Sequence, residues 1–229
     1  MTVLVVGNSV SQPPAPGVPA FPERLAARAD GRWRLDTIVT SGATIEQMEA
    51  DVLAALARLP QRLVLQVGIN ECAPRPLNWP ERERLGRVRP AALRMLIVRF
   101  IHLLRPAIIR TRRLQQFTPL PRFVASVRRV VSAAASSGIP VLVLPITEVT
   151  PVAEVRTPFT NREIRRYNEG LAQLAAPSVR VSTQREVFGE ADAAQLCVTP
   201  ESVHLGADAH ERLAEFIAAW LDAPAASAS

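Results

Sequence analysis

The sequence predicts an α/β fold of three layers, with a central parallel sheet of about five strands and helices on both faces. Short apolar runs alternate with segments of helical periodicity, which is typical of parallel strands joined by helical crossovers. Most of these runs are continuously apolar, as strands buried on both faces are. The chain has 229 residues, 48% hydrophobic and 21% charged, which suits one sizeable core.

Five runs are expected to form the strands of this sheet. They are residues 3–6, 33–39, 62–67, 141–144 and 179–182. Helices are expected at residues 21–29, 45–58, 122–136, 161–175 and 205–221, where apolar side chains recur at helical spacing. We therefore expect one domain over residues 1–222, with a basic helical insertion at 76–121 and a disordered tail at 223–229.

Composition limits the class of protein. The first residues lack the positive region of a signal peptide, and no apolar run approaches the roughly 18 residues of a spanning helix. Two cysteines, Cys72 and Cys197, do not make a disulfide framework. A reduced, cytoplasmic protein is expected. Neither metal-ligand spacing nor a glycine-rich phosphate loop is present, so no cofactor and no metal are expected.

The positive charge is concentrated in one segment. All 27 basic residues are arginine, and residues 82–129 hold 13 of them against a single acid, Glu83. That segment carries +12, while the rest of the chain carries −6. The net charge of +6 therefore describes a basic segment attached to a mildly acidic body.

Three polar positions follow the first three expected strands. Ser9 lies on a Gly-Asn-Ser turn, where its hydroxyl can be presented above the sheet. Gly42 has no Cβ and can offer a backbone N–H at close approach, and the side-chain amide of Asn70 can donate a hydrogen bond. Ligands of such sheets bind at the carboxyl ends of the strands. Each position alone is also compatible with an ordinary turn.

A fourth cluster precedes the last expected helix. Glu201 stands three residues before His204, so one loop can supply both a base and the carboxylate that orients it. A hydroxyl, a base and oxyanion donors are what acyl-ester hydrolysis requires.

In their order along the chain, these clusters resemble the sequence blocks of the SGNH/GDSL hydrolase superfamily. The matching blocks are Gly7-Asn8-Ser9, Gly42, Gly68-Ile69-Asn70-Glu71 and Glu201-Ser202-Val203-His204. The resemblance covers positions 7–210 except the basic insertion, and it implies a flavodoxin-like fold. Three positions depart from the family pattern, since Asn8, Glu71 and Glu201 each stand where the family has Asp.

The resemblance implies a serine esterase without a cofactor. Ser9 would be the nucleophile, His204 the general base and Glu201 its orienter, with the oxyanion hole formed by Ser9, Gly42 and Asn70. Small-molecule or glycan esters are the expected substrates. Two alternatives stay open: an acyltransferase using the same Ser/His site, and a catalytically silent binding protein that uses the basic segment.

The insertion is expected to contain an amphipathic helix at residues 91–104. At ~100° per residue, Arg94, His102 and Arg105 fall on one narrow face, with Arg99 at its edge, and the rest is apolar. A packed subdomain is the first interpretation, a lid over the substrate the second and a helix on anionic membrane the third. The arginines expected to meet a membrane or an anionic substrate are Arg94, Arg99, Arg105, Arg110, Arg112 and Arg113. Nucleic acid is not favoured, because few aromatic residues accompany the arginines. His210 is expected on the surface of the last helix.

Overall fold

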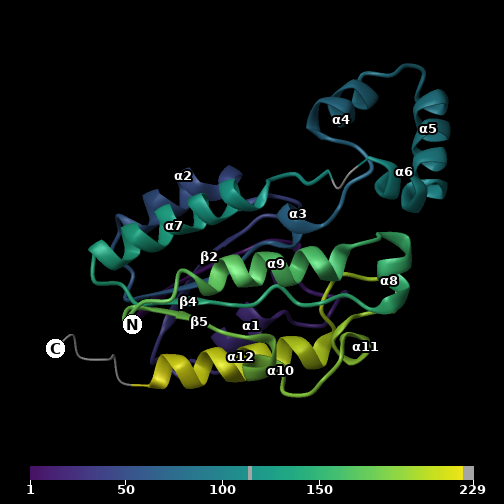
Figure 1. Ribbon diagram of the computed structural model, residues 1–229. Coiled ribbons are helices and arrows are strands. Elements are labelled where there is room, and N and C mark those ends of the chain that lie inside the picture. Colours follow the sequence, from purple (N-terminus) through teal and green to yellow (C-terminus); the bar gives the residue numbers. More distant parts are fainter. Residues whose placement is uncertain (113–114, 224–229) are drawn as a thin grey trace.

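The computed structural model describes residues 1–112 and 115–223, and its centre is a five-stranded sheet (Figure 1). The strands are β1 (Thr2–Gly7), β2 (Arg34–Val39), β3 (Arg62–Gln66), β4 (Val141–Val143) and β5 (Val179–Val181). They pair in the order β2-β1-β3-β4-β5, and every pair is parallel. The predicted fold class is confirmed.

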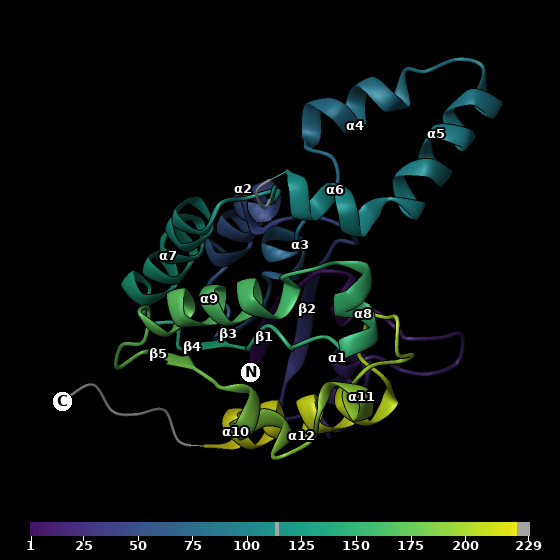
Figure 2. The same cartoon turned by 45° about the vertical axis from the view of Figure 1, so that its right-hand side comes forward.

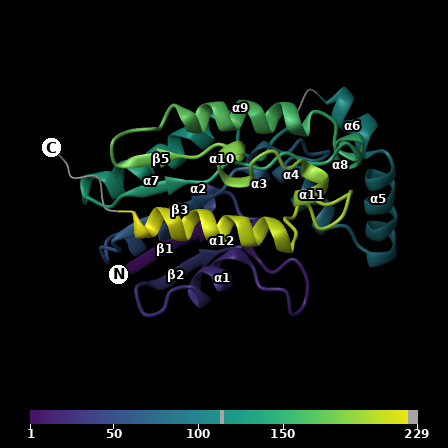
Figure 3. The same cartoon turned by 90° about the horizontal axis from the view of Figure 1, so that it is seen from below.

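Helices cover both faces of this sheet. In the body of the protein they are α1 (Phe21–Ala27), α2 (Ile45–Leu56), α3 (Ile69–Cys72), α7 (Leu120–Ser136), α8 (Pro151–Arg156), α9 (Thr160–Ala172), α10 (Gln184–Phe188), α11 (Ala193–Leu196) and α12 (Ala207–Asp222). Helices α2, α7 and α9 lie on one face, and α1, α10 and α12 on the other (Figure 1). Figure 3 shows α1 and α12 on the near side when the sheet is seen from below.

The core lies on both sides of the central strands. Residues 3–6 of β1 and 63–65 of β3 are fully buried, because helices cover both of their faces. Helix α2 starts at a capping box, in which the side chain of Gln47 accepts from the backbone of Thr44. Gly138 follows the C-terminal end of α7 and has φ +68°, the left-handed conformation that glycine tolerates.

Between β3 and β4, three helices extend away from the body: α4 (Trp79–Gly86), α5 (Ala91–Leu103) and α6 (Arg105–Thr111) (Figure 2). Helix α5 confirms the expected insertion helix almost to the residue. No residue of α5 is buried, and its apolar side is exposed. The exposed side chains are Leu93, Met95, Leu96, Phe100, Leu103 and, just after the helix, Leu104.

The polar side of α5 turns toward α4. His102 and Arg105 line a cavity together with Arg82 of α4, and Arg94 donates to the carbonyl of Gly86 at 3.3 Å. Arg94, Arg99 and His102 are exposed and Arg105 is half-buried, so the first interpretation, a packed subdomain with solvated arginines, stays a prediction.

Two expectations concern the chain ends and membranes. The tail expected to be disordered at 223–229 falls, apart from its first residue, outside the described residues. Among the helices of the described part, none is long and apolar enough to cross a membrane.

Candidate active site

The register of the sheet brings three of the predicted site segments to one edge. Gly7 at the end of β1 pairs with Val39 of β2 on one side and with Gln66 of β3 on the other. Ser9 follows this row by two residues, and Gly42 and Asn70 follow it by three and four. Because the strands are parallel, their carboxyl ends meet, and the three segments lie beside one another.

Ser9 begins a single turn of 3-10 helix, η1 (Ser9–Ser11), directly after β1. The turn is held by Asn8, which is buried and whose Oδ1 accepts from the backbone N–H of Val10 at 3.1 Å. Gly7 is required here, since a Cβ on it would lie 2.1 Å from Oγ of Ser11. Ser9 itself is half-buried. As the sequence indicated, the residue before the serine supports the turn.

Gly42 and Asn70 line a common cavity of about 580 Å³. Gly42 is exposed and has φ +73°, a left-handed conformation that disfavours any residue with a side chain. Nδ2 of Asn70 donates to the carbonyl of Ala43 at 2.8 Å. An amide nitrogen carries two hydrogens, so this contact fixes the amide and leaves one donor for another acceptor.

Glu71 ties the same two segments together by a second contact. Its carboxylate is fully buried, and Oε1 accepts from the backbone N–H of Ile45 at 2.6 Å, at the start of α2. Asn70 and Glu71 therefore clamp residues 43–45 from consecutive positions. Among the described residues Oε2 has no hydrogen-bond partner, and burial raises the pKa of Glu71 to about 7 against the lowering effect of the Ile45 N–H. Glu71, one of the three departures from the family pattern, therefore positions the segment that leads into α2.

Glu71→Gln is expected to remove a pH dependence of stability. Because the pKa is about 7 in the fold and 4.5 ordinarily, the native protein loses about 3 kcal/mol of unfolding free energy from this group between pH 4.5 and 7. Glutamine keeps the acceptor for Ile45 and cannot ionise. In urea unfolding, the free energy of unfolding of the variant should increase relative to that of the native protein as the pH rises from 4.5 to 7.

The exposed carboxylate of Glu169 on α9 supplies the matched control. Glu169→Gln should leave the pH curve of the native protein unchanged. Parallel stability curves for the native protein and Glu71→Gln across this range would contradict the raised pKa.

His204 lies in a loop that is fixed at both ends. The backbone N–H of Val198 donates to the carbonyl of His204 at 3.0 Å, and Cys197 and Leu205 form an isolated β-bridge. Val203 lines a small pocket with Asn8 and Val10, the two neighbours of Ser9. The histidine loop therefore packs against the serine turn, as the sequence led us to expect.

Ser202, rather than Glu201, is the side chain next to the imidazole. Oγ of Ser202 lies 3.5 Å from Nδ1 of His204 and accepts from the His204 backbone N–H at 2.9 Å. Glu201 is exposed, and within the described residues it forms neither a hydrogen bond nor an ion pair with His204. The segments that carry Ser9 and His204 are thus adjacent, and Glu201, the predicted orienter, does not contact the imidazole.

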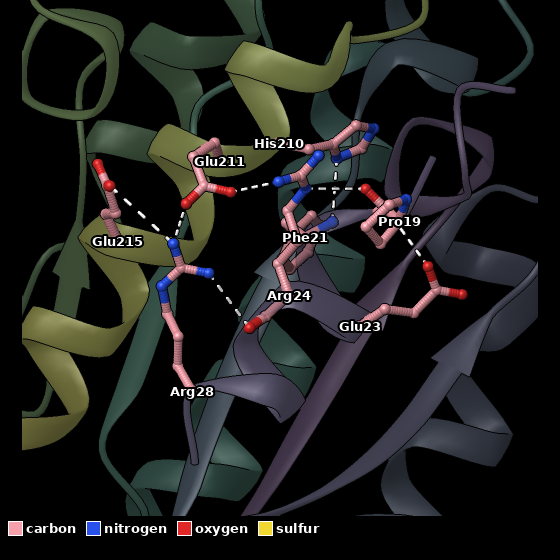
Figure 4. Close-up of polar contacts among 9 residues, drawn as sticks. Pro19, Phe21, Glu23, Arg24, Arg28, His210, Glu211 and Glu215 are labelled. Atoms are coloured by element: carbon pink, nitrogen blue, oxygen red, sulfur yellow. Dashed lines mark hydrogen bonds and ion pairs between the residues drawn. The ribbon is translucent and has the colours of Figure 1, made fainter. Parts of the chain in front are cut away.

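The expectation for His210 is wrong. It is buried, and its Nδ1 accepts from the backbone N–H of Phe21, which joins α12 to the start of α1 (Figure 4). Burial, and secondarily the charge of Arg24, lowers the pKa of His210 to about 4, so the ring is neutral at neutral pH. Beside it, Arg24 and Arg28 both pair with Glu211.

The arginines predicted to meet an anion have different surroundings. Arg112 is paired with Glu81 and also donates to the carbonyl of Pro76, so it is engaged within the insertion. Arg113 lies outside the described residues, and Arg99 and Arg110 are exposed. Arg105 faces the cavity next to α4.

Sequence reasoning missed an aromatic and cationic cluster beside Asn70. Trp79 stacks on Phe117 with ring centroids 4.3 Å apart, and Arg75 lies 4.5 Å over the Phe117 ring. These residues line the same cavity as Gly42 and Asn70. Because aromatic residues make up only 5% of the chain, Trp79 between Arg75 and Arg82 was the sequence feature that could have indicated this cluster. In the part of the chain that the structure describes, no group of three or more His, Cys, Asp or Glu side chains could hold a metal ion.

Known proteins similar to this chain share both the sequence pattern and the fold. The model of the GDSL-like lipase/acylhydrolase family matches residues 5–212. The structure resembles a lipase/acylhydrolase from Enterococcus faecalis, with TM-score 0.65, 11% identity and coverage of 96% of this chain and 95% of that chain. It also resembles a catalytic mutant of an acetylxylan esterase from Geobacillus stearothermophilus, with TM-score 0.61, 12% identity and coverage of 100% of this chain and 97% of that chain. For the protein TesA the TM-score is 0.59 and the identity 19%, with coverage of 97% of this chain and 98% of that chain. No curated protein sequence matches the chain. At these identities the structural likeness shows the fold alone.

Proposed function

Because the chain belongs to the GDSL-like lipase/acylhydrolase family, we propose that it is a serine esterase whose nucleophile is Ser9 and whose general base is His204. The observation that carries this proposal is the shared sheet edge, where the Ser9 turn meets Gly42 and Asn70 and packs against the His204 loop. An oxyanion hole formed by Ser9, Gly42 and Asn70 completes the set of groups that acyl transfer needs.

The proposed reaction has two halves. Oγ of Ser9 forms a bond to the ester carbonyl carbon while His204 takes the hydroxyl proton, and the carbonyl oxygen becomes an oxyanion held by three N–H donors. The C–O bond to the alcohol then breaks, and the alcohol leaves with the proton from His204. Water attacks the acyl-Ser9 ester, gives its proton to His204, and the acid leaves as Ser9 regains its hydrogen.

Glu201 is proposed as the residue that orients His204. In this role its carboxylate would accept from Nδ1–H, the position beside which Ser202 lies. Hydrogen bonds of a catalytic histidine commonly tighten only when substrate is bound. The loop from Thr199 to Gly206 is the part of the chain that has to bring the carboxylate to the ring.

Hydrolysis of p-nitrophenyl acetate and butyrate, with fluorophosphonate labelling, tests the proposal. The native protein should hydrolyse the esters, and the probe should modify Ser9 alone, as peptide mass mapping would show. An acyltransferase would give product mainly when an alcohol or amine acceptor is added. A folded protein with neither turnover nor label would refute the esterase proposal and favour the silent binding protein.

Small-molecule or glycan esters are the proposed substrates. The similarity to an acetylxylan esterase supports short acyl groups on a carbohydrate as the first class to screen. The acyl chain and the alcohol of the natural substrate are not assigned. The cytoplasmic location and the disordered tail expected from the sequence stay predictions.

The outer face of α5 supports contact with an anionic membrane as a second proposal. Phe100 and Leu103 are 55% and 73% exposed, and Arg99 and Arg110 are exposed on the same insertion. An apolar face flanked by arginine suits the boundary between lipid head groups and acyl chains. The protein should float with liposomes that contain phosphatidylserine and not with neutral ones. Absence of flotation at low salt would contradict this contact.

A further inference from the structure

Helices α4 and α5 lie side by side in the insertion (Figure 2), and residues of both line a cavity of about 390 Å³ that also holds positive side chains. Its polar wall consists of Arg75, Arg82, His102 and Arg105, and apolar side chains such as Val98 complete it. None of the described residues that line this cavity is acidic. We refer to this space as the cationic cavity.

The arginines of the cationic cavity lack the partners that other arginines of this chain have. Arg112 in the same insertion pairs with Glu81, whereas within the described residues Arg75, Arg82 and Arg105 form no ion pair. Nε of Arg75 and Nε of Arg105 are shielded from solvent and have no hydrogen-bond partner. A shielded donor on a charged group is costly unless an acceptor reaches it. Two such atoms at one cavity indicate an acceptor that is part of a ligand.

The charges also act on one another. Burial, followed by the positive charges of Arg105 and Arg82, lowers the pKa of Arg75 to about 10, so Arg75 remains cationic at neutral pH. A similar effect of burial, and of Arg156, lowers the pKa of Arg105. Three like charges in a partly enclosed space favour the binding of an anion, because it removes their repulsion.

Phe117 holds two of these guanidinium groups in place. Arg75 lies 4.5 Å and Arg82 lies 5.1 Å from the centroid of its ring, and Trp79 stacks on the same ring. Cation–π contacts at these distances restrict the guanidinium groups before any ligand arrives. The cluster is therefore preorganised, and less conformational entropy is lost when an anion binds.

The cationic cavity is joined to the proposed oxyanion hole. Nη2 of Arg75 donates to the backbone carbonyl of Asn70 at 3.2 Å. Arg75, Arg82 and Phe117 also line the cavity that contains Gly42 and Asn70. The two cavities are therefore adjacent, and Arg75 and Arg82 lie within reach of a substrate whose ester carbonyl is at Asn70.

We infer that the cationic cavity binds an anionic group of the ester substrate, a carboxylate or a phosphate, through Arg75, Arg82 and Arg105. This inference rests on the proposed esterase function, and it narrows the substrate to esters that carry a negative charge a few bonds from the carbonyl. The planar guanidinium fork matches both anions, so the chemistry shared by carboxylate and phosphate is what the cavity recognises.

Two p-nitrophenyl esters of similar acyl length test this directly: the neutral butyrate and the anionic monoglutarate. The native protein should hydrolyse the monoglutarate with a kcat/KM at least about tenfold higher. Arg82→Gln and Arg105→Gln should each lower that preference about tenfold. Arg110→Gln, which removes the same charge from an exposed position on α6, should keep the preference.

Isothermal titration with glutarate, propyl phosphate and the neutral glutaramide gives a readout that needs no catalysis. Glutarate or propyl phosphate should bind and glutaramide should not, and the tighter anion identifies the class. If butyrate is hydrolysed and Ser9 is labelled, but neither anion binds and no preference exists, the inference fails and the esterase stands. If no ester reacts and Ser9 is not labelled, the esterase fails, and the titration still decides whether the cavity binds anions.

Discussion

Ser9→Ala is expected to lower kcat/KM for p-nitrophenyl acetate by at least about 10³-fold, because the proposed acyl-enzyme forms on the Ser9 hydroxyl. His204→Ala should cost a similar factor, since without a base the hydroxyl is not activated. The double variant should be no worse than either single one, because nucleophile and base act as a unit.

Ser41→Ala is the matched control, since Ser41 is an exposed serine at the cavity that Gly42 and Asn70 line. It should retain nearly full activity. Circular dichroism and thermal unfolding confirm that each variant is folded. A folded Ser9→Ala protein with native activity would show that the assigned nucleophile is wrong.

Glu201→Gln and Ser202→Ala separate the two candidates for orienting the imidazole. If the carboxylate of Glu201 reaches His204 during the reaction, Glu201→Gln should lower kcat by about 10²-fold or more, and Ser202→Ala should have a small effect. The opposite order would assign the orientation to Ser202, the closer side chain in the structure.

Asn70→Ala is expected to have the second-largest effect, a loss of about 10²–10³-fold in kcat with little change in KM. In the proposed mechanism this side-chain donor stabilises charge that exists only after Ser9 has attacked, so substrate binding should not depend on it. The same change removes the hydrogen bond to the carbonyl of Ala43, and a loss of stability is expected beside the loss of rate.

Asn70→Asp removes the N–H donors without shortening the side chain. Aspartate has the same shape and offers no N–H, so kcat should fall as far as in the alanine variant. A rise in KM with unchanged kcat in both variants would place Asn70 in substrate binding and outside the oxyanion hole.

Most of the fold follows from local patterns in the sequence. The five strands were predictable because buried strands of a parallel sheet are short apolar runs, and α5 because its periodicity is strong. Helices α4 and α6 were not predicted as elements. Helix α4 is a polar segment that starts at the capping box of Asn78 and Glu81, and α6 is only seven residues long and begins beside Pro106.

His210 shows where a local pattern was present and was misjudged. It precedes Leu213, Ala214 and Ile217 at the helical spacing of a buried face. We expected it at the surface because histidine is polar. The centroid of its neutral ring lies 6.2 Å from the centroid of the Phe21 ring. Its Nδ1 accepts a hydrogen bond from the backbone N–H of Phe21, so this nitrogen has a partner although the ring is buried.

The site was predictable to the extent that it depends on strand ends. Ser9, Gly42 and Asn70 meet because parallel strands place their carboxyl ends together. The clamp of Glu71 on Ile45 joins residues 26 positions apart, and the stacking of Arg75 on Phe117 joins still more distant ones. The first contact depends on how the segments after β2 and β3 pack together and the second on how the insertion folds back, and no local periodicity encodes either.

The insertion leaves and rejoins the body at nearly the same point. The backbone N–H of Arg75 donates to the carbonyl of Gln115 at 2.7 Å, and Gln116 then bonds to the body through the carbonyl of Cys72 and the hydroxyl of Tyr167. The chain between these anchors can change in length or composition without altering the ends that the sheet and α9 hold. In a lineage of such proteins, substrate range and catalytic machinery can thus evolve at separate rates. The residues proposed to select the substrate lie in a replaceable insertion, whereas the proposed nucleophile and oxyanion hole lie at the strand ends.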